Sequence, residues 1–222
     1  MRILVACEES QAVCKEFRMK GHEAYSCDLE PCSGGCPQWH IRQNVLPLLN
    51  GNCEFYTCDG ARHFISGEWD MILAFPPCTY LTNTGNAWFN VQKYGQRAMN
   101  RLASRDVAAY FFMRFVNADC EKIAIENPIG HMSTRYRKPN QIIHPYMFGD
   151  AERKATCLWL KGLPELVPTN IVEPKIIAYK NGKGTDSPWH METMGLPPEQ
   201  RAKMRSKTFP GIARAMAEQW SD

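Results

Sequence analysis

Two apolar runs, each followed at once by a short polar peptide, most constrain the fold of this 222-residue chain. Residues 70–74 run into Phe75-Pro76-Pro77-Cys78, and residues 122–125 run into Glu126-Asn127-Pro128. Short apolar runs bounded by turn signals are typical of strands buried on both faces of a parallel sheet. Open α/β sheets carry their chemistry beyond the carboxyl ends of such strands, so we expect both peptides at one sheet edge. The spacing predicts an enzyme.

Length and composition predict a single domain over residues 1–222. A hydrophobic fraction of 44% and a charged fraction of 22% are ordinary for a globular protein and suffice for one buried core. No repeat or linker divides the chain. The formal charge of +3 permits a polyanionic partner without requiring one.

The pattern at the amino terminus favours a cytoplasmic protein. Residues 1–7 enter a strand directly, with no signal-peptide pattern, so we expect the 10 cysteines to be reduced. No apolar stretch approaches the roughly 18 to 20 residues that a membrane helix needs. We therefore expect no membrane partner.

The first 28 residues predict a strand, a helix, a second strand and an acid. The strands cover residues 2–6 and 23–27, and the helix covers residues 11–20, with the last residue of Cys7-Glu8-Glu9-Ser10 as its N-cap. Asp28 then stands about 20 residues beyond the first turn, where adenosine-binding folds place a carboxylate for the ribose hydroxyls. The glycine-rich turn of those folds is missing, and Asp28 also fits an Asx-turn.

The longest helical pattern covers residues 96–118. Its predicted apolar stripe contains Met99, Leu102, Ala103, Val107, Phe111 and Phe115. Arg97, Arg101 and Arg105 share another face, which either meets phosphates or is simply solvated. Elsewhere we predict a strand over 155–160, helices from 198 and over 210–220, a turn-rich segment over 50–67 and a loop over 171–187.

Three peptides together resemble the compact, phage-type DNA (cytosine-5) methyltransferases. They are Pro76-Pro77-Cys78, Glu126-Asn127-Pro128 and residues 208–217, in the order that this family shows. The resemblance covers most of the chain. It implies a Rossmann-like fold that binds S-adenosylmethionine, with a mostly parallel sheet and helices on both faces. It further implies methyl transfer to carbon 5 of a cytosine flipped out of DNA, and a monomer serving restriction-modification in a bacterial or phage-infected cell.

The chemistry of cytosine explains these residue types. Carbon 5 is not nucleophilic until a group adds to carbon 6, and a thiolate is suited to that addition. The resemblance implies that Cys78 is this nucleophile and that Glu126, with Asn127 beside it, holds or protonates ring nitrogen 3. General acid assistance contributes roughly 100- to 10,000-fold. Lys154 stands where the family has an arginine that helps to hold the base.

The resemblance also implies the binding residues. It places the methionine part of the cofactor near Cys7, Glu8, Glu9 and Ser10, the ribose at Asp28 and Leu29, the adenine at Asn44 and Val45, and Pro76 beside them. A loop over residues 79–89 closes over the flipped base. The implied DNA contacts are Thr79, Asn83, Trp88, Arg97 and Arg101. The chain has no room for a separate target-recognition domain, so we expect a short or relaxed target sequence.

Other functions and blander interpretations remain open. A folate-dependent methylase or hydroxymethylase of pyrimidine nucleotides also uses a Pro-Cys nucleophile, and a non-catalytic DNA-binding module of the same fold is a third class. Cys78 also fits a packed thiol, and Glu126 also fits a strand-end cap. Cys32 and Cys36 precede His40, but a structural zinc site needs four ligands, and the pattern does not decide whether Cys27, Cys53 or Cys58 would be the fourth. We therefore expect no metal.

Overall fold

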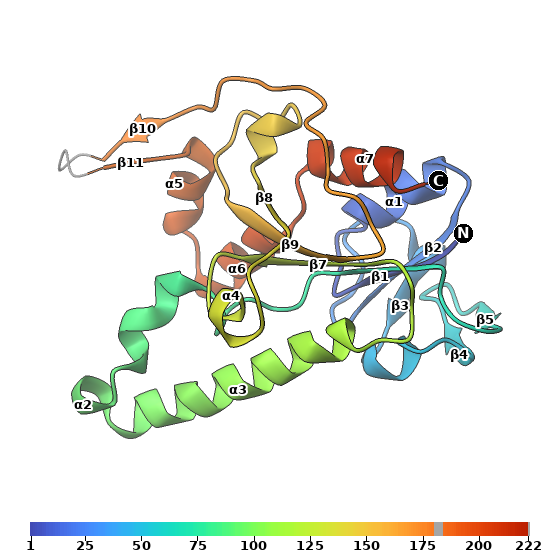
Figure 1. Ribbon diagram of the computed structural model, residues 1–222, viewed down its shortest axis with the longest axis horizontal. Coiled ribbons are helices and arrows are strands. Elements are labelled where there is room, and N and C mark those ends of the chain that lie inside the picture. Colours follow the sequence, from blue (N-terminus) through green and yellow to red (C-terminus); the bar gives the residue numbers. More distant parts are fainter. Residues whose placement is uncertain (180–183, 222) are drawn as a thin grey trace.

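The computed structural model describes residues 1–179 and 184–221, and its centre is a twisted sheet of seven strands in the order β3-β2-β1-β6-β7-β9-β8 (Figure 1). These strands are β1 (Arg2–Ala6), β2 (Glu23–Asp28), β3 (His40–Arg42), β6 (Met71–Ala74), β7 (Ile123–Pro128), β8 (Gln141–Ile143) and β9 (Thr156–Lys161). Neighbours from β3 to β7 pair in parallel, whereas β9 runs antiparallel to both β7 and β8. The α/β class and the mostly parallel sheet are confirmed.

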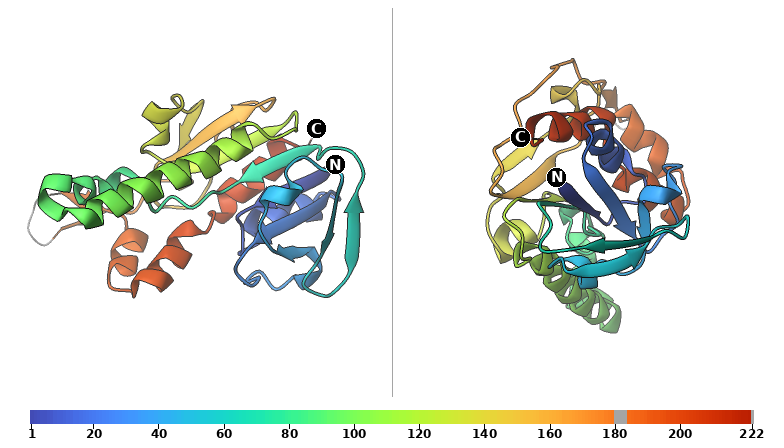
Figure 2. Two further views of the ribbon diagram at one scale, coloured as in Figure 1. Left: turned by 90° about the horizontal axis from the view of Figure 1, so that it is seen from below. Right: turned by 90° about the vertical axis from the view of Figure 1, so that its right-hand side faces the viewer.

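Helices cover both faces of the sheet, as expected. Helices α1 (Ala12–Met19) and α7 (Pro210–Gln219) pack together on one face, and α3 (Gln96–Val116) crosses the other (Figures 1 and 2). Side chains of β1 alternate between the two cores: Ile3 and Val5 join the α1 and α7 side, whereas Leu4 and Ala6 join the α3 side. This alternation is the period of two that a strand imposes. It accounts for the unbroken apolar run at the start of the chain.

The remaining helices and strands surround this sheet. They are α2 (Val91–Tyr94), α4 (Met132–Arg135), α5 (Pro188–Met194), α6 (Pro198–Ser206), the hairpin of β4 (Cys53–Tyr56) with β5 (Arg62–Ile65), and the hairpin of β10 (Ile177–Ala178) with β11 (Thr185–Asp186). Short 3-10 helices are η1 (Pro37–Trp39), η2 (Leu46–Leu48), η3 (Asn83–Phe89) and η4 (Pro145–Met147).

Two predicted loops therefore contain strands. The turn-rich segment over residues 50–67 forms β4 and β5, because alternate residues such as Cys53 and Phe55 are buried against the core. The loop expected over 171–187 contains β10 and β11, while residues 180–183 lie outside the described part of the chain.

The predicted apolar stripe of α3 is partly wrong. Met99 and Val107 are 51% and 69% exposed, whereas Ala109 and Phe112 are buried. The helix carries two overlapping apolar stripes, and the sheet selects the one that contains Phe112. The amino-terminal part of α3 extends past the sheet towards α2, so apolar residues there have no core to enter (Figure 1).

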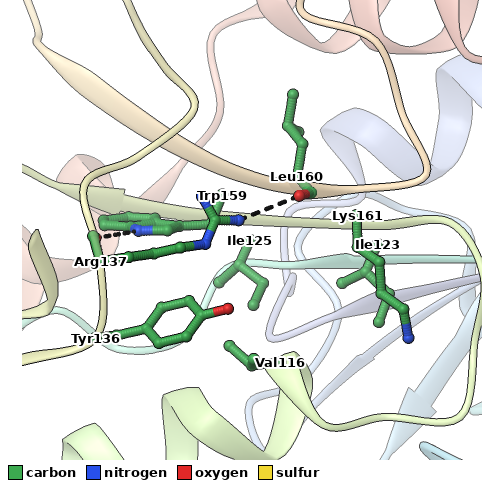
Figure 3. A pocket seen from close by; sticks show the side chains of 8 residues that line it. All are labelled: Val116, Ile123, Ile125, Tyr136, Arg137, Trp159, Leu160 and Lys161. Atoms are coloured by element: carbon green, nitrogen blue, oxygen red, sulfur yellow. Dashed lines mark hydrogen bonds between the residues drawn. The ribbon is translucent and has the colours of Figure 1, made fainter.

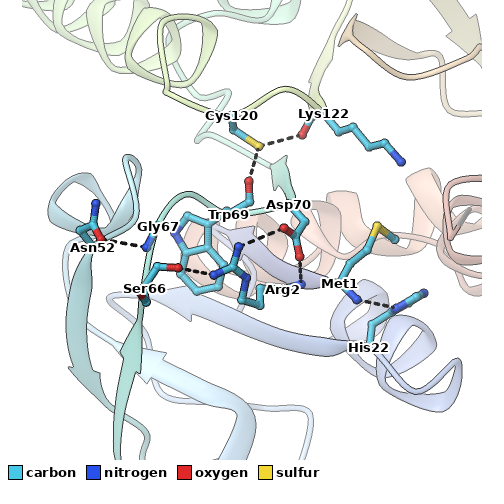
Figure 4. Close-up of polar contacts among 10 residues, drawn as sticks. All are labelled: Met1, Arg2, His22, Asn52, Ser66, Gly67, Trp69, Asp70, Cys120 and Lys122. Carbon is cyan, nitrogen blue, oxygen red and sulfur yellow. Dashed lines mark hydrogen bonds and ion pairs between the residues drawn. The ribbon is translucent and has the colours of Figure 1, made fainter.

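The amino-terminal ends of β1 and β6 are joined by polar contacts (Figure 4). The backbone amide of Arg2 donates to Asp70 Oδ2 over 2.6 Å, and its guanidinium contacts Asp70 Oδ1 at 3.1 Å. The buried Trp69 indole donates to the carbonyl of Leu48 over 2.6 Å. These contacts fix the register of the two central strands, whose other ends carry the candidate site. Among the described residues, no helix is both long and apolar enough to cross a membrane.

Candidate active site

The predicted site residues meet at the carboxyl edge of the sheet. The peptides 7–10, 44–45 and 75–78 follow β1, β3 and β6. Asp28 is the last residue of β2, and Glu126-Asn127 lies in the last part of β7. The chain leaves β1 for β2 and β3 on one side and returns to β6 and β7 on the other. Such a reversal opens the crevice in which α/β sheets bind ligands. Because β9 is antiparallel, residues just before its start lie at this same edge.

Cys78, Glu126 and Lys154 form an electrostatically coupled group at this edge. Although Cys78 as a residue is exposed, the protein atoms around its thiol raise its pKa by desolvation; the charge of Glu126 raises this pKa further and that of Lys154 lowers it. Burial likewise raises the pKa of Glu126, against the opposing charge of Lys154. The group therefore combines a thiol, a carboxyl group that is biased towards its protonated form, and a cation that acts on both.

Asn127 ties the end of β7 to the peptide that carries Cys78. Its side-chain amide is buried and donates to the carbonyl of Pro76 over 2.8 Å. The Cys78 carbonyl in turn accepts from the amides of Leu81 and Thr82 at 2.9 and 3.0 Å, so Cys78 stands at the start of a turn. The Asn127 Oδ1 atom is buried and has no hydrogen-bond partner among the described residues. The peptide Pro76-Pro77-Cys78 and the peptide Glu126-Asn127-Pro128 are thus joined directly by a hydrogen bond.

Lys154 is anchored rather than simply solvated. Its ammonium group donates to the carbonyl of Arg205 over 3.0 Å and lies 5.8 Å and 6.0 Å from the ring centroids of Trp189 and Phe209. Those two rings contact each other edge to face at 5.3 Å. The sequence predicts Lys154 as a site residue, but it does not predict this aromatic support, which comes from residues more than 30 positions away along the chain.

The first turn is capped differently from the prediction. Gln11, with a φ of 58°, is the N-cap of α1, and no side-chain hydrogen bond from it caps the helix. The carboxylate of Glu8 does the capping, since it accepts from the amides of Val13 and Cys14 at 2.7 and 3.2 Å. Burial raises the pKa of Glu8 to about 7. Ser10, the predicted cap, accepts only a 3.4 Å contact from Ala12.

Glu9 lies beside this cap and is also buried. Only 8% of its surface is exposed, and neither carboxylate oxygen has a hydrogen-bond partner among the described residues. Its ion-pair partner is Lys203 of α6, whose ammonium lies 4.0 Å away. Cys7 completes the turn with a φ of 60°, its amide donating to the Cys27 carbonyl over 2.7 Å.

The residues predicted to meet ribose and adenine have local bonds as well. Asp28 Oδ1 accepts from the amide of Glu30 over 3.0 Å, which is the Asx-turn alternative, and desolvation raises the pKa of Asp28. Leu29 is 69% exposed. Asn44 accepts from the amide of Leu46 over 3.0 Å, and the side chain of Val45 is buried in the core. Asp28 and Leu29 thus lie at the carboxyl edge of the sheet with Leu29 exposed, whereas the side chain of Val45 packs in the core.

Of the predicted DNA contacts, Arg97 and Arg101 lie on α3, and Thr79, Asn83 and Trp88 lie on one segment that α3 holds in place. Its aromatic rings pack on the arginines of α3, with Arg97 5.6 Å from the ring centre of Trp88 and Arg105 4.1 Å from that of Phe89. Arg101 lies over both Tyr80 and Phe89 at 5.0 and 5.1 Å. Neither interpretation of the arginine face foresaw this role. The alternation of aromatic residues over 80–94 with arginines four apart is the signal that predicts it.

Two other predicted DNA contacts belong to the same segment. The Thr79 carbonyl accepts from Arg101 at 3.4 Å, and the Asn83 side chain accepts from Asn86 over 3.1 Å. Thr79 and Asn83 are exposed, and Trp88 is 46% exposed. The segment over residues 79–95 therefore presents polar and aromatic groups next to Cys78.

The cysteine cluster near His40 has other partners. His40 is buried, and its two ring nitrogens contact Ser26 Oγ at 2.8 Å and the Glu30 carbonyl at 3.0 Å. The Cys32 thiol donates to Gln11 Oε1 over 2.9 Å. Within residues 1–179 and 184–221, no group of three or more His, Cys, Asp or Glu side chains is arranged to hold a metal ion.

A separate cavity of about 210 Å³ lies towards the opposite end of the sheet (Figure 3). It is lined by Val116, Ile123, Ile125, Tyr136, Arg137, Trp159, Leu160 and Lys161. A hollow of about 430 Å³ lies beside α1, between Met19, Trp39 and Pro210. Cys78 and Glu126 line neither of these two hollows.

Comparisons with known proteins assign no family. No protein-family model matches the chain, and no curated protein sequence matches it significantly. Its function is therefore argued from the residues and their geometry.

Proposed function

We propose that this protein is an S-adenosylmethionine-dependent DNA (cytosine-5) methyltransferase. The observation that carries the proposal is the coupling of Cys78 with Glu126 at the ends of the adjacent parallel strands β6 and β7. Lys154 acts on both groups from the segment just before β9. A nucleophilic thiol beside a carboxyl group that favours its proton is what addition to a pyrimidine ring requires.

The roles follow from this arrangement. The Cys78 thiolate adds to carbon 6 of the cytosine, and the Sγ–C6 bond forms as the electron pair of the ring double bond moves to carbon 5. Glu126, whose raised pKa favours the protonated form, gives its proton to nitrogen 3 and so neutralises the developing charge. Asn127 holds the two motifs in register through Pro76. After methylation, the carbon-5 proton passes to water and its electron pair re-forms the ring double bond, so that the Sγ–C6 bond breaks and releases the Cys78 thiolate. Nitrogen 3 returns its proton to Glu126.

The first turn fits the proposed cofactor. S-adenosylmethionine supplies an electrophilic methyl group when bound, and it carries positive charge on a sulfonium and an ammonium group. Glu9 offers a buried carboxylate with no hydrogen-bond partner among the described residues. Glu8 already occupies the two amides at the start of α1 that a diphosphate would need. The turn is therefore suited to a cation, with Asp28 placed for the ribose.

Duplex DNA is the proposed partner, recognised by a monomer in the cytoplasm of a bacterial or phage-infected cell. A stacked cytosine cannot reach a thiol at a sheet edge, so the base must flip out at a cost of a few kcal/mol. The segment over residues 79–95 borders Cys78 and presents Trp88 to fill the vacated stack. Arg97 and Arg101 keep their charge while packed on aromatic rings, which leaves their outer edges for phosphates.

Trapping the adduct tests the proposal. Purified protein is incubated with S-adenosylmethionine and duplex DNA that contains 5-fluorocytosine, because fluorine blocks the final elimination. We expect a protein–DNA adduct that survives denaturation and requires the cofactor. Cys78→Ser abolishes it, whereas Cys58→Ser, which removes another exposed thiol, leaves it intact.

The same experiment distinguishes the alternatives. A folded protein that binds the cofactor but forms no adduct would contradict the proposal, and free dCMP with a folate cofactor would then be the acceptor to test. If an adduct forms, bisulfite sequencing of methylated DNA gives the target. A site of six or more fixed bases would contradict the expected short or relaxed specificity.

A further inference from the structure

The Glu9 carboxylate is buried at the sheet edge, and its ion-pair partner Lys203 lies 4.0 Å away. It is 8% exposed, and both of its oxygens lack hydrogen-bond donors among the described residues. Burying a carboxylate without donors is strongly unfavourable unless a cation compensates it. Such a group in a ligand crevice indicates a binding site whose donors come from the ligand.

The surrounding backbone holds Glu9 in this position. Its carbonyl accepts from the amide of Ser33 over 2.9 Å. Gly34 packs so closely on the next residue of the turn that a Cβ there would lie 2.5 Å from the Ser10 carbonyl oxygen. Glu8, on the other side, is fixed by its two bonds to the start of α1. Glu9 is therefore preorganised, and among the described residues no group donates a hydrogen bond to its carboxylate.

Lys203 shows which kind of cation the site accepts. Its ammonium lies 4.0 Å from Glu9 Oε2, beyond hydrogen-bond length, and its side chain is 47% exposed. At this distance Lys203 offsets the charge of Glu9 but donates no hydrogen bond to it, so a ligand that brings a hydrogen-bond donor can bind the carboxylate more closely. A sulfonium group has no N–H to donate, whereas a primary ammonium group has three. A metal ion is disfavoured because no cluster of three suitable side chains exists in the described residues.

We propose that Glu9 binds the primary ammonium group of an amino-acid-bearing ligand, which displaces Lys203. The inference rests on the proposed function, in which this group is the α-ammonium of the methionyl part of the cofactor. Displacement has a consequence beyond Glu9, because the carbonyl of Arg205, two residues after Lys203, accepts the bond from Lys154. Ligand binding at the first turn is thereby linked through one short segment to the cation that acts on Cys78 and Glu126.

Two ligands that differ only in the amino-acid part test this site by titration calorimetry. S-adenosylhomocysteine has the ammonium group without the sulfonium charge, and 5′-methylthioadenosine has the same nucleoside without the amino acid. A charged hydrogen bond contributes about 1.5–3 kcal/mol, so we expect the first ligand to bind about 10- to 100-fold more tightly. Glu9→Gln should remove this advantage and leave the affinity for 5′-methylthioadenosine within about twofold.

Lys203→Met supplies a readout that a structural defect does not produce. Removing the competing ammonium should strengthen binding of S-adenosylhomocysteine by about two- to fivefold, the effect of a partly exposed ion pair. Lys207→Met, a nearby exposed lysine, is the matched control and should change nothing. Glu9→Asp keeps the charge but shortens its reach, and should give an intermediate affinity. Circular dichroism of each variant verifies folding.

The outcomes separate the inference from the proposed function. Equal affinities of the two ligands for the unmodified protein, or an equal loss of both in Glu9→Gln, would overturn the role of Glu9 while leaving the methyltransferase proposal standing. If the folded protein binds neither ligand, the proposed cofactor is wrong, and the inference fails with it.

Discussion

Asn127 donates a hydrogen bond of 2.8 Å to the carbonyl oxygen of Pro76, across the ends of the adjacent strands β7 and β6. Both groups are buried. The bond makes the position of Cys78, two residues after Pro76, depend on a side chain 51 residues beyond Pro76. A buried side-chain hydrogen bond thus adds to the backbone pairing of β6 and β7 and links the peptide that carries Cys78 to the strand that carries Glu126.

Replacing Asn127 tests that dependence. Asn127→Leu leaves the Pro76 carbonyl buried without a partner, which costs about 1–3 kcal/mol of unfolding free energy. We also expect a lower yield of the 5-fluorocytosine adduct at a temperature where the variant is folded. Denaturant unfolding gives the stability, and Asn100→Leu, which removes an exposed bond with Gln96 on α3, is the control. Equal stability of the two variants would contradict the role of Asn127.

Lys154 should set the reactivity of the Cys78 thiol. Its charge lowers the pKa of both Cys78 and Glu126, so Lys154→Met raises both. The thiolate of Cys78 then appears at higher pH, and alkylation by iodoacetamide at pH 8 slows about 3- to 10-fold because less of the thiol is ionised. Peptide mass spectrometry against pH follows Cys78 among the other thiols. Lys154→Arg should restore the profile, and Arg153→Met should not change it.

Glu8 should make stability fall as the pH rises. Its pKa is about 7 in the folded protein against 4.5 for an ordinary glutamate, so the folded state holds the proton more tightly than the unfolded state. The contribution is fully present below pH 4.5 and is lost as the pH approaches 7, on the order of 3 kcal/mol. Glu8→Gln removes this decline, whereas Glu218→Gln, exposed on α7, keeps it.

Denaturant unfolding of these Glu8 and Glu218 variants at several pH values measures the effect. The informative quantity is the difference between unmodified protein and variant at each pH, since other carboxylates titrate in the same range. If that difference does not change between pH 4.5 and 7, the pKa of Glu8 is not raised in the folded protein.

Gly34 should be intolerant of a side chain. A Cβ there would lie 2.5 Å from the Ser10 carbonyl oxygen and 2.6 Å from Gln11 Cβ, closer than such atoms approach. Gly34→Ala must displace the first turn, at a cost of about 1–3 kcal/mol, and should weaken nucleoside binding. Gly195→Ala, where a Cβ meets no atom within 4 Å, is the control. Thermal unfolding compares the two, and equal midpoints would argue against this contact.

Arg105 should restrain the segment over residues 79–95. Its guanidinium lies 4.1 Å from the ring centre of Phe89, and an exposed cation–π contact contributes about 0.5–1 kcal/mol. Arg105→Met should therefore speed amide hydrogen exchange across the segment about two- to fivefold, while Arg114→Met on the same helix should not. Unchanged exchange would mean that the other arginines suffice to hold the segment.

Much of the fold could be predicted because its signals are local. The apolar runs before Phe75 and Glu126 need burial on both faces, and only a mostly parallel sheet covered by helices supplies it. Strand ends fix where the following residues lie, so the gathering of Cys78 and Glu126 at one edge follows from the sequence alone. The hairpin over residues 53–65 escaped prediction because its apolar alternation is short and interrupted by turn residues.

Details of the candidate site depend on contacts between distant residues. Glu8 rather than Ser10 caps α1 because the unusual backbone at Gln11 turns the earlier side chain towards the helix amides. The burial of Phe112 on α3 was decided by which stripe meets the sheet. The local sequence does not decide whether Glu8 or Ser10 caps α1, nor which apolar stripe of α3 is buried, because the spacing of residues allows both possibilities in each case.

The sequence by itself determined the class of fold, the edge at which the chemistry-bearing residues collect and the identity of the thiol and carboxyl group there. Only the tertiary structure decided what surrounds them: the aromatic rings and the Arg205 carbonyl that hold Lys154, and the absence of donors around Glu9 in the described residues. The physical reason is that strand periodicity is encoded in neighbouring residues. The burial and charge of a side chain are set by whichever distant segments pack against it.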